Sequence, residues 1–197
     1  MQLETPITKR KPHPPKKETT RSITYRLPAR MVEELETEAN EKQISQNVLV
    51  KQIVEKYLQW DRFASKIGMI PVPKSLLMTL GEDMKDIDIT KIVDAIVPVI
   101  SESVLFMKGD YDLKRCIEAL EDYMKASGMK SDHRMEGNIH HFIIQHDLGM
   151  KWSLFTEMLL KSIFNEFIPE KDLKCKLTDK TVIASIPLGS DFDEHSY

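Results

Sequence analysis

The stretch that decides the N-terminal fold is RSITYRLP, residues 21–28. Polar and apolar side chains alternate along it until Pro28: the polar residues are Ser22, Thr24 and Arg26, and the apolar residues are Ile23, Tyr25 and Leu27. Alternation with a period of two is typical of a short β-strand, because successive side chains of a strand point to opposite faces. The sequence therefore predicts one strand with a polar face and an apolar face.

Two helices are predicted to follow this strand. Pro28 suits the first turn of a helix, and the apolar residues after it recur at helical spacing as far as Lys42. Ser45 is a good N-cap for a second helix, which is apolar over more than one stripe and extends to Leu58. Residues 21–60 are thus expected to form a strand and two helices.

A unit of this size is expected to need a partner. About 40 residues bury too little surface to be stable alone, and the lone strand has two unpaired edges. Pairing of two copies through antiparallel strands satisfies the edges and covers the apolar surface of the second helix. We therefore expect an intertwined homodimer with a shared apolar core. The predicted core residues are Ile23, Tyr25, Leu27, Val32, Leu35, Val48, Ile53 and Tyr57.

The polar face of such a ribbon is a candidate reader of DNA. A two-stranded ribbon fits the major groove of B-DNA, where Arg contacts guanine and Ser or Thr reaches several base edges. If the apolar face packs on the helices, Ser22, Thr24 and Arg26 point outward. These three residues are the predicted base contacts.

At this point the sequence resembles the ribbon-helix-helix DNA-binding proteins of the Arc, MetJ and CopG type, over residues 21–58. The resemblance implies a sequence-specific transcriptional regulator, typically a repressor. In that family the amides at the start of the second helix clamp a DNA phosphate, which implies this role for Ser45, Gln46 and Asn47. Many members have Gly in the turn between the helices, where this sequence has Lys42 and Gln43.

The charge distribution also favours DNA binding by the N-terminal part. Residues 1–60 have a net charge of +3, whereas residues 61–197 have a net charge of −6. Residues 1–20 are basic and rich in Pro, with almost nothing apolar, so we expect a mobile arm that is either a solvated tail or a DNA-binding arm. The predicted phosphate contacts in and beside this arm are Lys9, Arg10, Lys11, Lys16, Lys17 and Arg21.

The predicted fold class is mainly α with an α+β C-terminal domain. After a linker over 61–87, the pattern of residues 88–187 predicts the order ααβαββ, with a sheet of about three strands covered on one face. The expected elements are helices over 90–108 and 110–128, a strand over 138–146, a helix over 150–167 and a hairpin over 173–186. Thr90 and Asp110 are the expected N-caps of the first two helices. Residues 188–197 are predicted to form an acidic tail.

Metal-responsive relatives of the resembled family bind nickel through His and Cys, so such residues of the C-terminal part are candidate ligands: His133, His140, His141, His146 and Cys175. Neighbours on a strand point to opposite faces, and His140 and His146 would lie roughly 20 Å apart. We therefore predict no metal site and no cofactor from the strand alone. The domain is expected to sense a small molecule or metal, or to assemble dimers of dimers; its aromatic helix over 150–167 could cover an apolar effector.

Other classes of protein are less favoured by the sequence. No apolar run approaches the ~18 residues of a membrane span, so we expect a cytoplasmic protein with no membrane partner. No phosphate loop, nucleophile elbow or paired-Cys motif is present, which argues against an enzyme. The alternative is an antitoxin with the same DNA-binding unit. Its toxin-binding segment would be disordered until bound, whereas residues 88–187 are predicted to fold.

Overall fold

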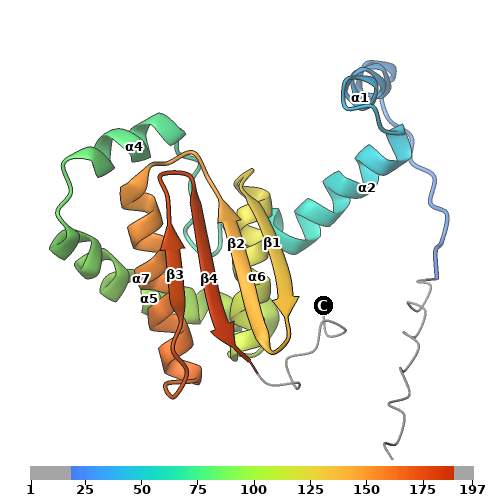
Figure 1. The fold of residues 1–197 in the computed structure, drawn as a ribbon. Coiled ribbons are helices and arrows are strands. Elements are labelled where there is room, and N and C mark those ends of the chain that lie inside the picture. Colours follow the sequence, from blue (N-terminus) through green and yellow to red (C-terminus); the bar gives the residue numbers. More distant parts are fainter. Residues whose placement is uncertain (1–18, 189–197) are drawn as a thin grey trace, which may run out of the picture. The chain divides into compact units, whose positions relative to one another are not determined.

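The computed structural model describes residues 19–188, which contain helices and an antiparallel sheet (Figure 1). The protein is therefore of mixed α+β class, as predicted. The chain divides into two compact units, of which the first ends at Leu49 and the second begins at Val50.

The first unit contains α1 (Ala29–Glu41) and the start of α2 (Gln46–Lys56). Pro28 precedes α1 with a φ of −54°, close to the value that its ring imposes. Residues 19–28 have no regular secondary structure, so the predicted strand over 21–27 is not formed in this single chain. A strand is defined by hydrogen bonds to a neighbouring strand, and the described part of this chain contains none for this segment.

The turn between α1 and α2 forms without glycine. Gln43 has a φ of 55° and is the only non-glycine residue with positive φ among residues 19–188. Its left-handed conformation ends α1, and the Ile44 N–H then bonds back to the Ala39 carbonyl at 3.0 Å. Ser45 caps α2 as predicted, because its Oγ accepts a hydrogen bond from the Val48 N–H at 3.3 Å.

The helical conformation continues beyond α2, which differs from the predicted boundary after Trp60. A π-helical turn η1 (Tyr57–Asp61) and α3 (Arg62–Ala64) follow α2 directly. Their aromatic residues pack within the second unit: the Trp60 ring lies 5.5 Å from that of Tyr123, and the Phe63 ring lies 5.9 Å from that of Phe106. The predicted linker over 61–87 also contains α4 (Lys74–Glu82). The packing of these apolar residues, rather than the Gly and Pro content, determines the secondary structure of this part of the chain.

Three longer helices follow in the second unit. They are α5 (Asp86–Lys108), α6 (Leu113–Ala126) and α7 (Met150–Phe167). The bounds of α7 match the prediction, whereas α5 begins ahead of Thr90. The N-cap of α6 is Asp112 and not Asp110, because the Asp112 carboxylate accepts a hydrogen bond from the Arg115 N–H at 2.7 Å. α5 ends at Lys108, as predicted, and the next residue, Gly109, has a φ of 79°.

The sheet has four antiparallel strands, in place of the expected three. Their order is β1-β2-β4-β3, with β1 (Lys130–Glu136), β2 (Ile139–Gln145), β3 (Lys174–Leu177) and β4 (Thr181–Pro187). The sequence of β1 is largely polar, since it is an edge strand that hides little surface, and its alternation is therefore weak. Gly137, with a φ of 64°, joins β1 to β2 in a tight turn. The C-terminal order is thus ααββαββ.

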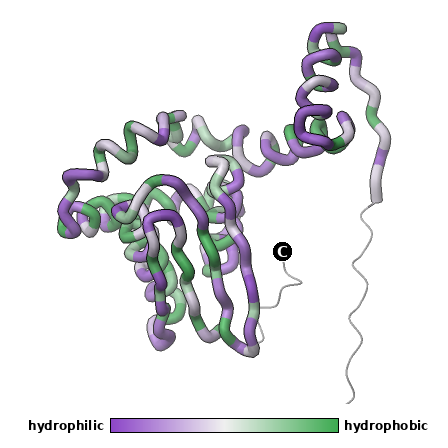
Figure 2. Tube along the Cα trace, turned by 45° about the horizontal axis from the view of Figure 1, so that its top comes forward, coloured by the Kyte–Doolittle hydropathy of each residue, from purple (hydrophilic) through white to green (hydrophobic). Residues whose placement is uncertain are grey.

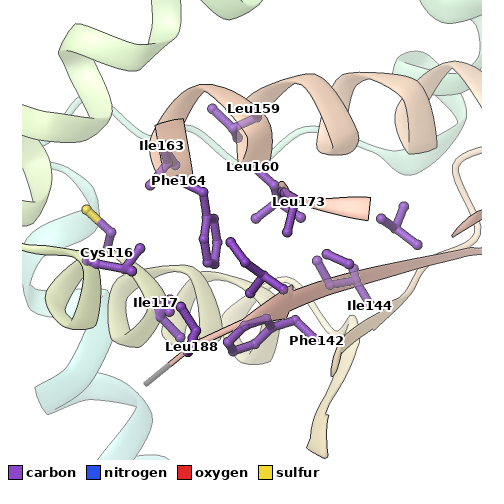
Figure 3. Close-up of a cluster of buried hydrophobic side chains, with 14 of the residues drawn as sticks. Cys116, Ile117, Phe142, Ile144, Leu159, Leu160, Ile163, Phe164, Leu173 and Leu188 are labelled. Carbon is purple, nitrogen blue, oxygen red and sulfur yellow. The ribbon is translucent and has the colours of Figure 1, made fainter. Parts of the chain in front are cut away.

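Helices α6 and α7 cover one face of this sheet (Figure 1). In Figure 3, Leu160 and Phe164 of α7 point toward Phe142 and Ile144 of β2. Figure 2 shows hydrophobic residues concentrated on the central strands β2 and β4, with β1 largely hydrophilic. Leu188, expected in the acidic tail, is instead buried in this core because it follows β4 directly. The rest of that tail lies outside the described residues.

Candidate nucleic-acid interface

The predicted base contacts lie in the segment that precedes α1. Ser22, Thr24 and Arg26 are all exposed, and so is Arg21. The apolar residues between them are exposed as well: Ile23 by 69%, Tyr25 by 70% and Leu27 by 45%. The single chain therefore offers both faces of the segment to a partner.

Most of the predicted dimer core is also exposed. Val32, Val48, Ile53 and Tyr57 are exposed, and Leu35 is half-buried. Among residues 19–49, only Ala39 and Leu49 are buried. The first unit thus leaves most of its large apolar side chains in contact with water, although this is costly at roughly 25 cal/mol per Å² of apolar surface.

At the start of α2, the Val48 N–H is capped by the Ser45 side chain, whereas the two N–H groups before it lie ahead of the first hydrogen bond of the helix. The first hydrogen bond within the helix runs from the Leu49 N–H to the Ser45 carbonyl at 3.0 Å, so the N–H groups of Gln46 and Asn47 precede it. Asn47 and Ser45 are exposed. Gln46 is half-buried, and its side-chain amide donates to the Val32 carbonyl at 3.3 Å. Its side chain therefore ties α2 to α1, and only its backbone N–H suits the predicted phosphate contact.

Helix α1 is strongly acidic. It carries one basic residue, Arg30, and five glutamates. Arg30 is paired with Glu34 at 2.8 Å, and Lys42 is paired with Glu38 at 2.8 Å. Since a polyanion repels such a surface, α1 is poorly suited to face DNA, and the candidate interface is confined to residues 21–26 and 45–47. The five predicted phosphate contacts of the arm, from Lys9 to Lys17, lie outside the described residues.

The histidines of the sheet are held by hydrogen bonds. His140 is buried, and its neighbour His141 lies on the opposite face, where its Nδ1 is 2.8 Å from the Ser185 hydroxyl. His133 of β1 stacks on Phe142, and its Nε2 is 2.9 Å from Nδ1 of His140. Sequence reasoning missed this proximity because the polar β1 carries no strand pattern. Within residues 19–188, no group of three or more His, Cys, Asp or Glu could hold a metal ion.

His146 is part of a buried hydrogen-bonded chain. Its Nδ1 accepts from the Leu148 N–H at 3.2 Å, and its Nε2 donates to the Ser153 hydroxyl at 3.0 Å. Ser153 in turn donates to the Thr178 carbonyl. Burial lowers the pKa of His146 below its usual range, which favours the neutral ring. Its role here is to join β2, α7 and the β3–β4 turn.

Neither cysteine has the environment of a reactive thiol. Burial raises the pKa of Cys116 to about 12 and that of Cys175 to about 11. Both thiols are therefore protonated and neutral at physiological pH, and a nucleophilic role would require the thiolate. Cys116 packs in the core, and Cys175 lies half-buried on β3.

Two comparisons with known proteins give no further guide to the function of this chain. No helix in the part of the chain from 19 to 188 is long and apolar enough to cross a membrane. No protein-family model and no curated protein matches this chain.

Proposed function

We propose that this protein is a homodimeric, sequence-specific DNA-binding transcriptional regulator that reads the major groove with a two-stranded β-ribbon. The observation that carries the proposal is the exposure of the whole apolar side of residues 21–27, together with the apolar side chains of α1 and α2. Two copies that pair through this segment would bury Ile23, Tyr25 and Leu27 against both sets of helices. Ser22, Thr24 and Arg26 would then form the outer face of the ribbon.

The order and chemistry of the surrounding elements support the same proposal. The segment is followed by two helices, and the second begins at a Ser cap with backbone N–H groups at an exposed helix start. Such a start attracts a phosphate through its dipole and its N–H groups. The acidic α1 would face away from the DNA.

The folded second unit favours a regulator over an antitoxin. Residues 50–188 carry their own core of buried residues from α5, α6, α7 and the sheet. A toxin-binding segment is typically short and orders only on binding. We therefore assign the second unit to signal sensing or to the assembly of dimers on DNA.

The proposal is tested with the full-length protein and genomic DNA fragments. Selection of bound fragments should enrich one sequence motif, and Arg26→Ala should lose about 1–3 kcal/mol of discrimination at one base pair of it. Arg30→Ala is the matched control, because Arg30 is equally basic and exposed but pairs with Glu34 on α1. No enriched motif, or equal effects of the two variants, would contradict the proposal.

A further inference from the structure

An apolar cavity of about 250 Å³ lies among the helices of the second unit. Its walls come from α5, α6 and α7, from the turn η1 and from the segment between α3 and α4. Representative wall residues are Trp60, Ile67, Val99, Ala119, Tyr123 and Trp152. The cavity adjoins the hydrophobic core, because Cys116, Leu159 and Ile163 belong to both; Figure 3 shows these three residues in the core.

The side chains that line the cavity are uncharged and mostly apolar, which favours an apolar ligand. None of the described residues that line the cavity is charged, and aromatic rings stand in pairs: Trp60 lies 5.5 Å from Tyr123, and Trp152 lies 5.1 Å from Phe155. The hydroxyl of Ser103, one of the few polar groups, donates to the Val99 carbonyl at 2.7 Å. An apolar cavity excludes water but accepts apolar molecules, because water would lose its hydrogen bonds there. A charged or strongly polar ligand would lose its hydration without compensation.

The cavity opens at the surface and is far larger than the voids that packing leaves in protein interiors. Protein interiors contain few voids larger than one water molecule, which takes up about 30 Å³ of the liquid. The cavity also has a route to its interior: the wall residues Met69 and Val99 are exposed by 44% and 49%. One wall is the segment of residues 65–73, which contains no helix or strand.

We propose that this cavity is a binding site for a small, uncharged, apolar molecule of about two or three rings in size. Bound there, the molecule would contact Trp60 of the π-helical turn. Such turns are rare and occur frequently at functional sites. Here the turn is spanned by the Lys56–Asp61 ion pair at 3.0 Å, whose spacing of five residues matches the wider helix. The site belongs to the second unit alone and does not depend on the proposed DNA binding.

The test uses the full-length protein and N-phenyl-1-naphthylamine, a neutral aromatic probe whose fluorescence rises in apolar surroundings. We expect saturable binding with one probe per chain, accompanied by quenching of Trp fluorescence. Ala119→Phe places a ring in the cavity and should weaken binding at least tenfold. Ala95→Phe is the matched control, because Ala95 is an exposed residue of α5 outside the cavity, and it should bind the probe like the wild type.

Ser103→Phe places a ring in the cavity from α5. This variant replaces Ala119→Phe if Ala119→Phe does not give the wild-type circular dichroism spectrum. Equal affinities of wild type and both filling variants would overturn the proposal, because the probe would then bind elsewhere. A second outcome would also overturn it. In that outcome the wild type binds no probe, and sedimentation shows that the wild type is a dimer whereas Ala119→Phe is a monomer. The cavity would then be a contact between copies of the chain.

Discussion

Among single residues, those of the proposed ribbon depend most strongly on its register. A shift by one residue would exchange the DNA-reading face for the core face, since side chains alternate along a strand. Tyr25 is 70% exposed in the single chain and would become buried in the dimer. Thr24, its neighbour, would remain on the outer face.

Neighbouring substitutions should therefore have opposite effects. Tyr25→Ala should lower the free energy of unfolding of the dimer by about 3–5 kcal/mol, because it leaves a cavity under the ribbon. Thr24→Ala should leave the melting temperature nearly unchanged and relax preference at one base pair. Melting temperature and affinity for the selected and for random DNA are measured for both variants. The reverse pattern would mean that Ser22, Thr24 and Arg26 are not the readers.

His146 makes stability depend on pH. Its pKa is lowered in the folded protein by burial, whereas it is about 6.5 in the unfolded chain. Below pH 6.5 the unfolded chain therefore binds a proton that the folded protein does not, and the free energy of unfolding falls as pH decreases. The decrease is at most about 1.4 kcal/mol per pH unit and stops at the lowered pKa.

Denaturant unfolding at a series of pH values measures this decrease. His146→Gln cannot take up the proton and should show a shallower decrease below pH 6.5 than the wild type. His141→Gln, on the opposite face of the sheet, serves as the control for removal of a histidine. An unchanged pH slope in His146→Gln would show that another group causes the decrease.

Among the elements, the turn between α1 and α2 contains a measurable strain. Gln43 has a φ of 55°, a conformation that costs a residue with a side chain about 1–3 kcal/mol. Glycine adopts it freely but loses more entropy on folding, by roughly 0.5–1 kcal/mol. The position coincides with the turn where many ribbon-helix-helix proteins have glycine.

Gln43→Gly should therefore raise the free energy of unfolding of this helical pair by up to about 2.5 kcal/mol, the difference between the strain relieved and the entropy lost. Lys42→Gly is the control one residue earlier, where φ is −82° and any residue fits; it should destabilise by roughly 0.5–1 kcal/mol. Thermal unfolding followed by circular dichroism compares the two. Stabilisation by both, or by neither, would argue against a left-handed residue at this turn.

Across the whole molecule, the N-terminal and C-terminal parts carry net charges of opposite sign. Residues 1–60 carry a net charge of +3, and residues 61–197 carry −6. DNA attracts the first and repels the second, so binding by the N-terminal part should be strongly dependent on salt. This dependence tests the role of the arm.

Deletion of residues 1–20 removes five Lys and Arg residues. Affinity should fall for all DNA sequences alike, and the slope of log K against log salt concentration should become shallower by about 0.9 for each phosphate that the shortened protein no longer neutralises. Fluorescence anisotropy at several salt concentrations measures both quantities. An unchanged slope would identify the arm as a solvated tail without a part in DNA binding.

Elements with local signals could be predicted from the amino-acid sequence. The helix over 150–167, the hairpin that ends the sheet and the Ser45 cap follow from periodicity and from residues that act on their own backbone. The alternation of residues 21–27 likewise predicts a strand, but a strand needs a partner. Whether it forms depends on a second chain, and the prediction therefore remains a proposal.

Features that depend on distant neighbours emerge only in the folded chain. β1 forms because it pairs along its whole length with β2, although the sequence of β1 is polar. This pairing brings His133 beside His140. Trp60 packs on Tyr123, and this contact accompanies the continuation of α2 into η1, past the expected boundary. Both residues line the apolar cavity. Such contacts join residues far apart in the chain. Their free energy comes from burial and packing, which the local pattern of a sequence does not encode.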